Sequence, residues 1–172
     1  MDQGMAGLIG AAVGGLIGVV GTLGAARLTG RDQKRNQHEY WRRQQRRDAY
    51  SQLVSQTSEA LRFGSNALDA YEGREPSSGE LAEGFSEAVR KLNAAETLVA
   101  LEGPEEAAAE AAEMVTELYT WANSMFLGIG LREGRFTGAD WSVSLPELMH
   151  HRETSHEALA TFTAFCRRLL DS

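Results

Sequence analysis

The feature that most constrains this chain is an uncharged segment near its N-terminus, because no charged residue occurs from Gln3 through Ala26. A helix of residues 4–26 would be ~35 Å long at ~1.5 Å per residue, and the hydrocarbon core of a bilayer is ~30 Å thick. A cleaved signal peptide would need basic residues before its apolar part, whereas the only charge before this segment is Asp2. The segment therefore predicts an uncleaved transmembrane helix within residues 1–26.

Residues 27–49, called the basic collar below, contain eight Lys and Arg residues against three acidic ones, although the net charge of the chain is −7. Because Lys and Arg beside a span favour the cytoplasmic side of a membrane, we expect the N-terminus outside and the C-terminal domain in the cytoplasm. Arg27 and Arg31 are close enough to the predicted span to contact anionic lipid head groups. The single cysteine excludes an intramolecular disulfide, which fits a reducing compartment.

The predicted span has two unlike sides when its residues are placed at intervals of about 100° around a helix. Its glycines all fall within one half of the circumference, and bulky apolar side chains fill the other half. A glycine face lets helix backbones approach closely in lipid, and the sequence offers no second apolar span to fill this one. We therefore expect the chain to form a homo-oligomer through these glycines: Gly7, Gly10, Gly14, Gly18 and Gly21.

The basic collar lacks the apolar stripe of a helix that lies in the membrane interface. Glu39 and Arg43 form a favourable i,i+4 pair, so the collar is predicted to be a solvated helical stalk. Nucleic acid is not an expected partner, because the arginines lie beside the predicted span and no recognition motif accompanies them. The chain thus divides into residues 1–26, the stalk of residues 27–49 and a helical domain of residues 50–172.

The domain of residues 50–172 contains four amphipathic patterns of helical period, and no stretch alternates in the manner of a strand. Four such helices predict an all-α, antiparallel four-helix bundle. Their limits follow from turn and capping signals: an end near Glu72, a capping box of Ser77 with Glu80, a third helix over residues 105–127 that Gly128 and Gly130 end, and a fourth capped by Ser144 with Glu147.

The third predicted helix has two distinct faces. Its apolar side includes Ala111, Val115, Leu118, Ala122 and Met125, and its other side carries a row of glutamates. The row is interpreted as a solvated surface, with a site for a cation or a basic partner as the alternative. The glutamates are Glu105, Glu106, Glu110, Glu113 and Glu117.

The segment of residues 127–144 is predicted to be a loop, and it is long for a connection within a bundle. It contains Arg132, Arg135, Phe136 and Trp141. Phe136 and Trp141 are predicted to close one end of the bundle. The alternative is that the loop binds a protein partner, with Arg132 and Arg135 beside the two aromatic residues.

Two Glu-x-x-His units on the fourth predicted helix resemble ligand motifs of di-iron bundles. The helical wheel separates His150 from His156 by about 120°, so a shared metal site is disfavoured and no cofactor is expected. The simpler interpretation has His150 and His151 in solvent and His156 partly buried. Cys166 lies on the apolar stripe, which favours a buried small side chain over a nucleophile.

The apolar segment followed by WRRQQRRDAY, Trp41 to Tyr50, resembles uncharacterised single-span membrane proteins of high-GC Gram-positive bacteria. In those proteins an arginine-rich juxtamembrane helix leads into a small helical domain. The resemblance covers residues 5–60 and implies neither an activity nor any site residue.

The leading functional hypothesis is a membrane-anchored, non-enzymatic interaction or scaffold module. A membrane-disrupting effector, in which the glycine-faced helices form a pore, is the alternative. A water-filled pore needs polar residues on its wall, and Thr22 is the one such residue in the predicted span. A membrane-tethered enzyme is the third hypothesis, and the sequence offers no catalytic motif for it.

Overall fold

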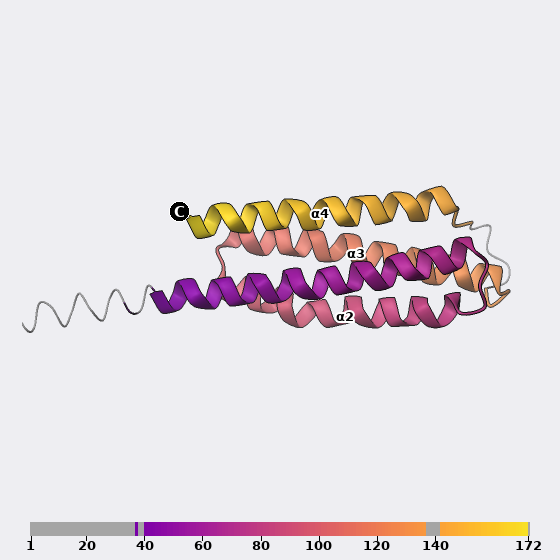
Figure 1. Ribbon diagram of the computed structural model, residues 1–172, viewed down its shortest axis with the longest axis horizontal. Helices are drawn as coiled ribbons and strands as arrows, with labels where there is room; N and C mark the ends of the chain where they lie inside the picture. Colours follow the sequence, from indigo (N-terminus) through magenta and orange to yellow (C-terminus); the bar gives the residue numbers. More distant parts are fainter. Residues whose placement is uncertain (1–36, 38–39, 137–141, 172) are drawn as a thin grey trace, which may run out of the picture. The chain divides into compact units, whose positions relative to one another are not determined.

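The computed structural model describes residues 37, 40–136 and 142–171, and within these residues the chain forms four helices and no strand. The prediction of an all-α helical bundle is therefore confirmed. The helices are the first helix, residues 40–72, which is the indigo-to-magenta ribbon of Figure 1, then α2 (Ser78–Glu102), α3 (Glu105–Arg132) and α4 (Leu145–Asp171).

The chain divides into two compact units, residues 1–43 and 44–172, and the second unit is the bundle. Consecutive helices of the bundle run in opposite directions (Figure 1). Helix α3 packs against both α2 and α4. The first helix reaches α4 through Tyr50 and Phe162, whose ring centroids are 6.3 Å apart in an edge-on arrangement. The last residues of the predicted stalk, 44–49, belong to this unit, and Ala49 is already buried.

The capping signals were correct in one case and incorrect in another. The Glu147 backbone N–H donates to Ser144 Oγ at 3.3 Å, so Ser144 caps α4 as predicted. Ser77 precedes the first residue of α2, but its hydroxyl donates to Glu75 Oε2 at 3.2 Å and makes no capping hydrogen bond. The capping box of Ser77 with Glu80 is therefore wrong, because the backbone of Ser77 is itself helical, with φ −72° and ψ −9°, whereas a capping residue is usually extended.

The predicted end of the third helix is wrong, since α3 continues through Gly128 and Gly130 to Arg132. Both glycines are buried. A Cβ on Gly128 would lie 3.4 Å from the Tyr71 hydroxyl and the Val143 side chain, and a Cβ on Gly130 would overlap the Phe136 ring. These glycines make room for neighbouring segments, so their presence marks close packing and not a helix terminus.

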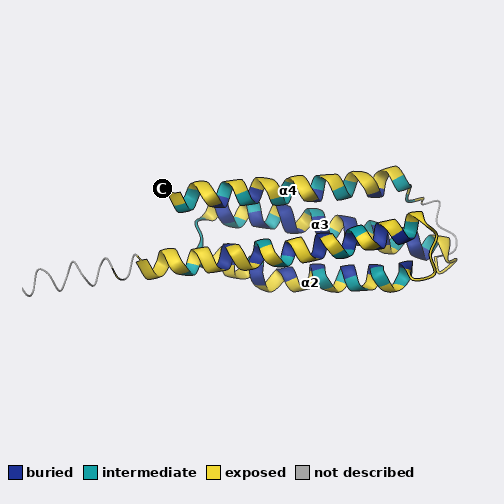
Figure 2. Cartoon of the chain, in the orientation of Figure 1, coloured by how far each residue is buried: buried dark blue, intermediate teal, exposed yellow. Residues whose placement is uncertain are grey.

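The core of the bundle is centred on Trp121 of α3, which the apolar stripe read from the sequence left out. Its side chain is fully buried, and its ring centroid lies 4.7 Å from that of Phe85 on α2. A Cβ on Gly64 of the first helix would lie 2.7 Å from the Trp121 ring and 2.9 Å from Phe85. Three helices thus meet at one indole, and dark-blue buried positions line the facing sides of the helices in Figure 2.

Several polar atoms lie inside this core. Thr57 and Ser155 are fully buried, and their hydroxyl oxygens have no hydrogen-bond partner within the described part of the chain. The indole nitrogen of Trp121, Nε1, is also buried without a hydrogen-bond partner among the described residues. An unpaired buried hydroxyl or N–H costs free energy, so these positions weaken the packing around them.

No helix in residues 40–136 or 142–171 is long and apolar enough to cross a membrane. The predicted span, its five association glycines, Arg27 and Arg31 lie outside the described residues. The span and the helical stalk before residue 40 therefore stay predictions.

Two glycine-to-alanine substitutions should have opposite effects on the stability of the bundle. Gly64→Ala forces a Cβ into the Trp121 ring, and we expect a loss of about 1–3 kcal/mol in the free energy of unfolding. Gly84→Ala on α2 places its Cβ 3.8 Å from Phe63, an ordinary contact. It should stabilise by about 0.5–1 kcal/mol through helix propensity. Urea denaturation followed by circular dichroism measures both, and equal effects would contradict the packing described.

Candidate functional site

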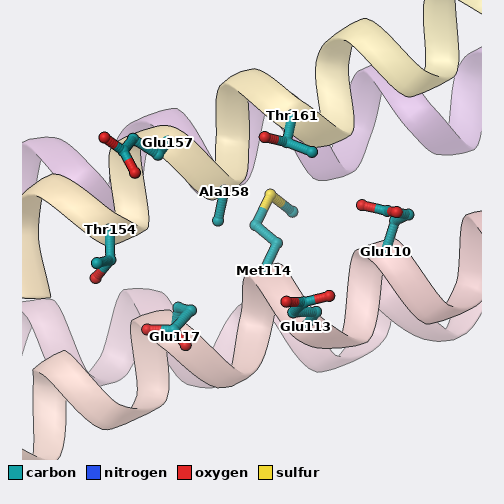
Figure 3. Close-up of a pocket in the computed structure, with 8 residues that line it drawn as sticks. All are labelled: Glu110, Glu113, Met114, Glu117, Thr154, Glu157, Ala158 and Thr161. Atoms are coloured by element: carbon teal, nitrogen blue, oxygen red, sulfur yellow. The ribbon is translucent and has the colours of Figure 1, made fainter.

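The bundle has a groove between α3 and α4 with a volume of about 430 Å³ (Figure 3). Carboxylates of Glu110, Glu113 and Glu117 line it on the α3 side, and Glu157 lines it on the α4 side. Met114 and Ala158 point into the gap between the two helices. Met114 is 1% exposed, so the groove has an apolar floor beneath acidic walls.

The spacing of these residues explains the groove. Glu110, Glu113 and Glu117 are separated by three and four positions, which places them along one face of α3. Thr154, Glu157 and Thr161 repeat in the same way on α4. Three of the five glutamates predicted to form a solvated row therefore border α4, where Glu113 is exposed and Glu110 and Glu117 are half-buried, and Glu105 and Glu106 are exposed outside the groove.

The α4 side of the groove was missed at the sequence level. Thr154, Glu157 and Thr161 form a polar stripe beside the apolar one, and this stripe is the signal that could have indicated it. Its pairing with the glutamates depends on which helices are neighbours, which one helix alone does not reveal.

The groove offers hydrogen-bond acceptors and negative charge, and these groups suit cationic or amide-bearing groups. Within residues 40–136 and 142–171, no three side chains of His, Cys, Asp or Glu are placed to hold a metal ion. The groove is thus an acidic surface feature with no metal-binding geometry among these residues.

Arg132 lies on α3 and not in a loop, and its guanidinium joins the ends of two other helices. Nη1 donates to the backbone carbonyl of Tyr71 at 2.6 Å, and Nη2 donates to Ser78 Oγ at 3.2 Å. The guanidinium carbon also lies 3.8 Å from the centroid of the Tyr71 ring. Since Tyr71 is near the end of the first helix and Ser78 begins α2, Arg132 holds this end of the bundle together.

A pair of aromatic rings lies close to Arg132 in the sequence. The Phe126 and Phe136 centroids are 5.9 Å apart, and the Arg135 guanidinium lies 5.4 Å from the Phe126 ring. Phe126 is 39% exposed and Phe136 is 38% exposed, so each ring keeps one side in solvent. Arg135 also pairs with Glu133 at 2.7 Å. Trp141, the fourth residue of the predicted partner-binding set, lies outside the described residues.

The interpretation of the histidines was partly wrong. His150 is exposed as expected, but His156 is also exposed, whereas His151 is half-buried with its Nε2 3.4 Å from Ser124 Oγ on α3. The reason is that the buried face of α4 contains Leu148, Ser155 and Phe162, whereas Met149 lies outside this face. Met149 is 37% exposed, and His156, seven positions later on the same side of the helix, is exposed too.

The end of the basic collar takes part in the bundle through Arg46. Its Nε donates to the backbone carbonyl of Glu102 at 2.8 Å, close to the C-terminus of α2. A cation at the C-terminal end of a helix is favourable, because the last carbonyls of a helix lack internal partners. The partner of Arg46 in the acidic domain is therefore a backbone carbonyl and not a carboxylate.

Cys166 is buried on α4, as expected from its place on the apolar stripe. Burial raises the pKa of the Cys166 thiol from its ordinary value of 9.0 to about 11. A thiol with this pKa is almost entirely protonated near neutral pH and is therefore a poor nucleophile.

Comparisons of the chain with protein-family models, curated proteins and solved structures find no match.

We predict that Arg132→Ala lowers the free energy of unfolding by about 1–2 kcal/mol, because two hydrogen bonds from a charged donor are lost. Arg132→Lys should restore little of this stability, since an ammonium cannot reach both acceptors as a planar guanidinium does. Arg135→Ala, which removes an exposed pair with a neighbouring residue, should change the stability by about 0.5 kcal/mol or less. Urea denaturation of the three variants tests this, and equal losses for Arg132→Ala and Arg135→Ala would contradict it.

The raised pKa of Cys166 predicts that the bundle loses stability at alkaline pH. The unfolded thiol ionises near its ordinary pKa of 9.0, while the folded thiol keeps its proton to about 11. The stabilisation is therefore complete below pH ~8.5 and disappears as the pH rises through ~11, a loss of up to about 2–3 kcal/mol. The midpoint of urea unfolding, measured at pH 7, 9 and 10.5, gives the dependence of stability on pH. Cys166→Ala should reduce the loss of stability at alkaline pH, and an unchanged loss would show that Cys166 is not its cause.

Proposed function

We propose that this chain is a membrane-anchored, non-enzymatic interaction module that self-associates through a glycine-rich N-terminal span. Its C-terminal bundle would lie in the cytoplasm, and Arg27 and Arg31 would contact anionic head groups. The proposal combines the sequence pattern of the N-terminal 49 residues with the bundle that follows them.

The observation that carries the proposal is the composition of the first helix. Residues 40–72 form one helix, which contains the end of the basic collar and the first core residues of the bundle. Ala49 and Tyr50 are 5% and 3% exposed, only a few residues after Arg46 and Arg47. Residues 44–49 of the basic collar are therefore part of the folded domain, and this direct connection supports the proposal that the bundle is held close to the predicted span.

The exposed aromatic pair is the surface that we assign to a protein partner. Phe126 and Phe136 present apolar ring faces to solvent beside the Arg135 guanidinium. Rigid aromatic side chains with a neighbouring arginine are the typical anchors of protein interfaces. Arg132, which was grouped with them in the sequence, is engaged within the bundle and has a structural role.

The oligomeric state of the full chain in nanodiscs tests the self-association. We expect a defined oligomer by mass photometry for the unaltered chain, and monomers for Gly14→Leu combined with Gly18→Leu. Leucine at these positions separates backbones that the glycines allow to approach. A monomeric unaltered chain would refute self-association through the span.

The control enlarges the other half of the helix by one methylene group at each of two positions. Val13→Leu combined with Val20→Leu enlarges the bulky side and should leave the oligomer intact. If this control dissociates the oligomer as completely as the glycine variants do, the interface is not the glycine face. An unchanged circular dichroism spectrum in each case shows that the bundle is still folded.

A further inference from the structure

Helix α4 has fewer completely buried residues than its neighbours α2 and α3. Four of its 27 residues are buried, whereas eleven of the 28 residues of α3 and seven of the 25 residues of α2 are buried. Burial of apolar surface is the main favourable term in helix packing. Helix α4 is therefore attached largely through side chains that are only half-buried against the core: Leu145, Ala158, Leu159, Phe165, Leu169 and Leu170. Its buried residues are Leu148, Ser155, Phe162 and Cys166.

The middle of the α4 contact is polar. Leu148, Ser155 and Phe162 are separated by seven residues each, so they lie in line along the face that packs on the bundle. Ser155 is fully buried, and its hydroxyl oxygen has no hydrogen-bond partner within the described residues. This hydroxyl loses its water without gaining a partner, which favours a state in which α4 is solvated.

The boundary between α3 and α4 adds like charges to this weak core. The groove brings together carboxylates from both helices, Glu113 and Glu117 on one side and Glu157 on the other, and its described lining contains no Lys or Arg. Two polar contacts between α4 and other helices are long. His151 Nε2 lies 3.4 Å from Ser124 Oγ, and Arg152 Nη1 lies 3.9 Å from Asp69 Oδ1. Contacts of this length contribute little to stability.

The strongest contacts of the other three helices do not involve α4. Trp121 joins α3 to Phe85 of α2 and to Gly64 of the first helix. Arg132 ties the end of the first helix to the start of α2, and Arg46 binds the other end of α2.

From these observations we infer that α4 is a releasable helix, which opens from the bundle as a unit while the first helix, α2 and α3 stay packed. Opening exposes the apolar line of Leu148 and Phe162 on α4. It also exposes the surface around Tyr50 and Met114 that α4 covers. Local unfolding of this kind occurs where burial is least, and it gives the bundle a second conformation with a new apolar surface. This conformational device is separate from self-association through the span.

The single thiol of the chain reports this opening, because Cys166 lies on the buried side of α4. The experiment uses the full chain in nanodiscs and measures the rate at which a water-soluble disulfide reagent labels Cys166 at neutral pH. Hydrogen exchange measured by mass spectrometry runs in parallel. We expect backbone amides of residues 150–162 to exchange at least about tenfold faster than those of residues 114–125. Equal opening constants for the two segments would overturn the inference.

Ser155→Ala removes the unpaired hydroxyl and should slow Cys166 labelling by about tenfold, since the closed state no longer buries it. Ser86→Ala on α2 is the control. The Ser86 hydroxyl donates to the Ala82 carbonyl at 2.9 Å, and its removal should not slow the labelling. Fraying of the last turn alone would expose Cys166 without any dependence on Ser155. Identical labelling of Ser155→Ala and the unaltered chain would therefore refute opening of α4 as a unit.

Discussion

The rest of the bundle depends on the packing of the Trp121 indole against Gly64 and Phe85. The ring occupies space that a side chain on the first helix would fill, so the first helix and α3 reach their observed separation only because residue 64 is glycine. The edge-on contact with Phe85 then fixes the position of α2 along the other two helices. One large side chain thus sets the register of three helices, and Arg132 and Arg46 hold α2 in that register near its two ends.

The sequence predicted the helices well and their close contacts poorly. Periodicity identified four helices and most of their buried faces, because burial of an apolar stripe leaves a pattern within each helix. Gly128 and Gly130 were interpreted as a helix terminus, although α3 passes through both. A glycine in a helical pattern has the same local signature whether it ends the helix or admits a neighbouring ring. The Phe136 ring that decides between these roles comes from another segment of the chain.

The same limit applies to the candidate site. The glutamates of α3 were visible as a row, but the groove exists because Thr154, Glu157 and Thr161 of another helix face them. Arg132 was assigned to a partner surface on residue type, and its acceptors, Tyr71 and Ser78, are more than fifty residues away in the sequence. Contacts over such separations depend on the topology, which a single sequence does not encode in a local pattern.

The order of the helices in the chain explains why burial is distributed unevenly. Two residues separate α2 from α3, and five separate the first helix from α2, so each of these pairs forms at a small cost in loop-closure entropy. The indole of α3 then completes a three-helix core by reaching both earlier helices. The last helix packs on the side of this core where Tyr50 and Met114 lie, and the Ser155 hydroxyl at the middle of its contact has no hydrogen-bond partner among the described residues. Because a buried hydroxyl without a partner costs free energy, the contact of α4 with the core is weakened at its middle.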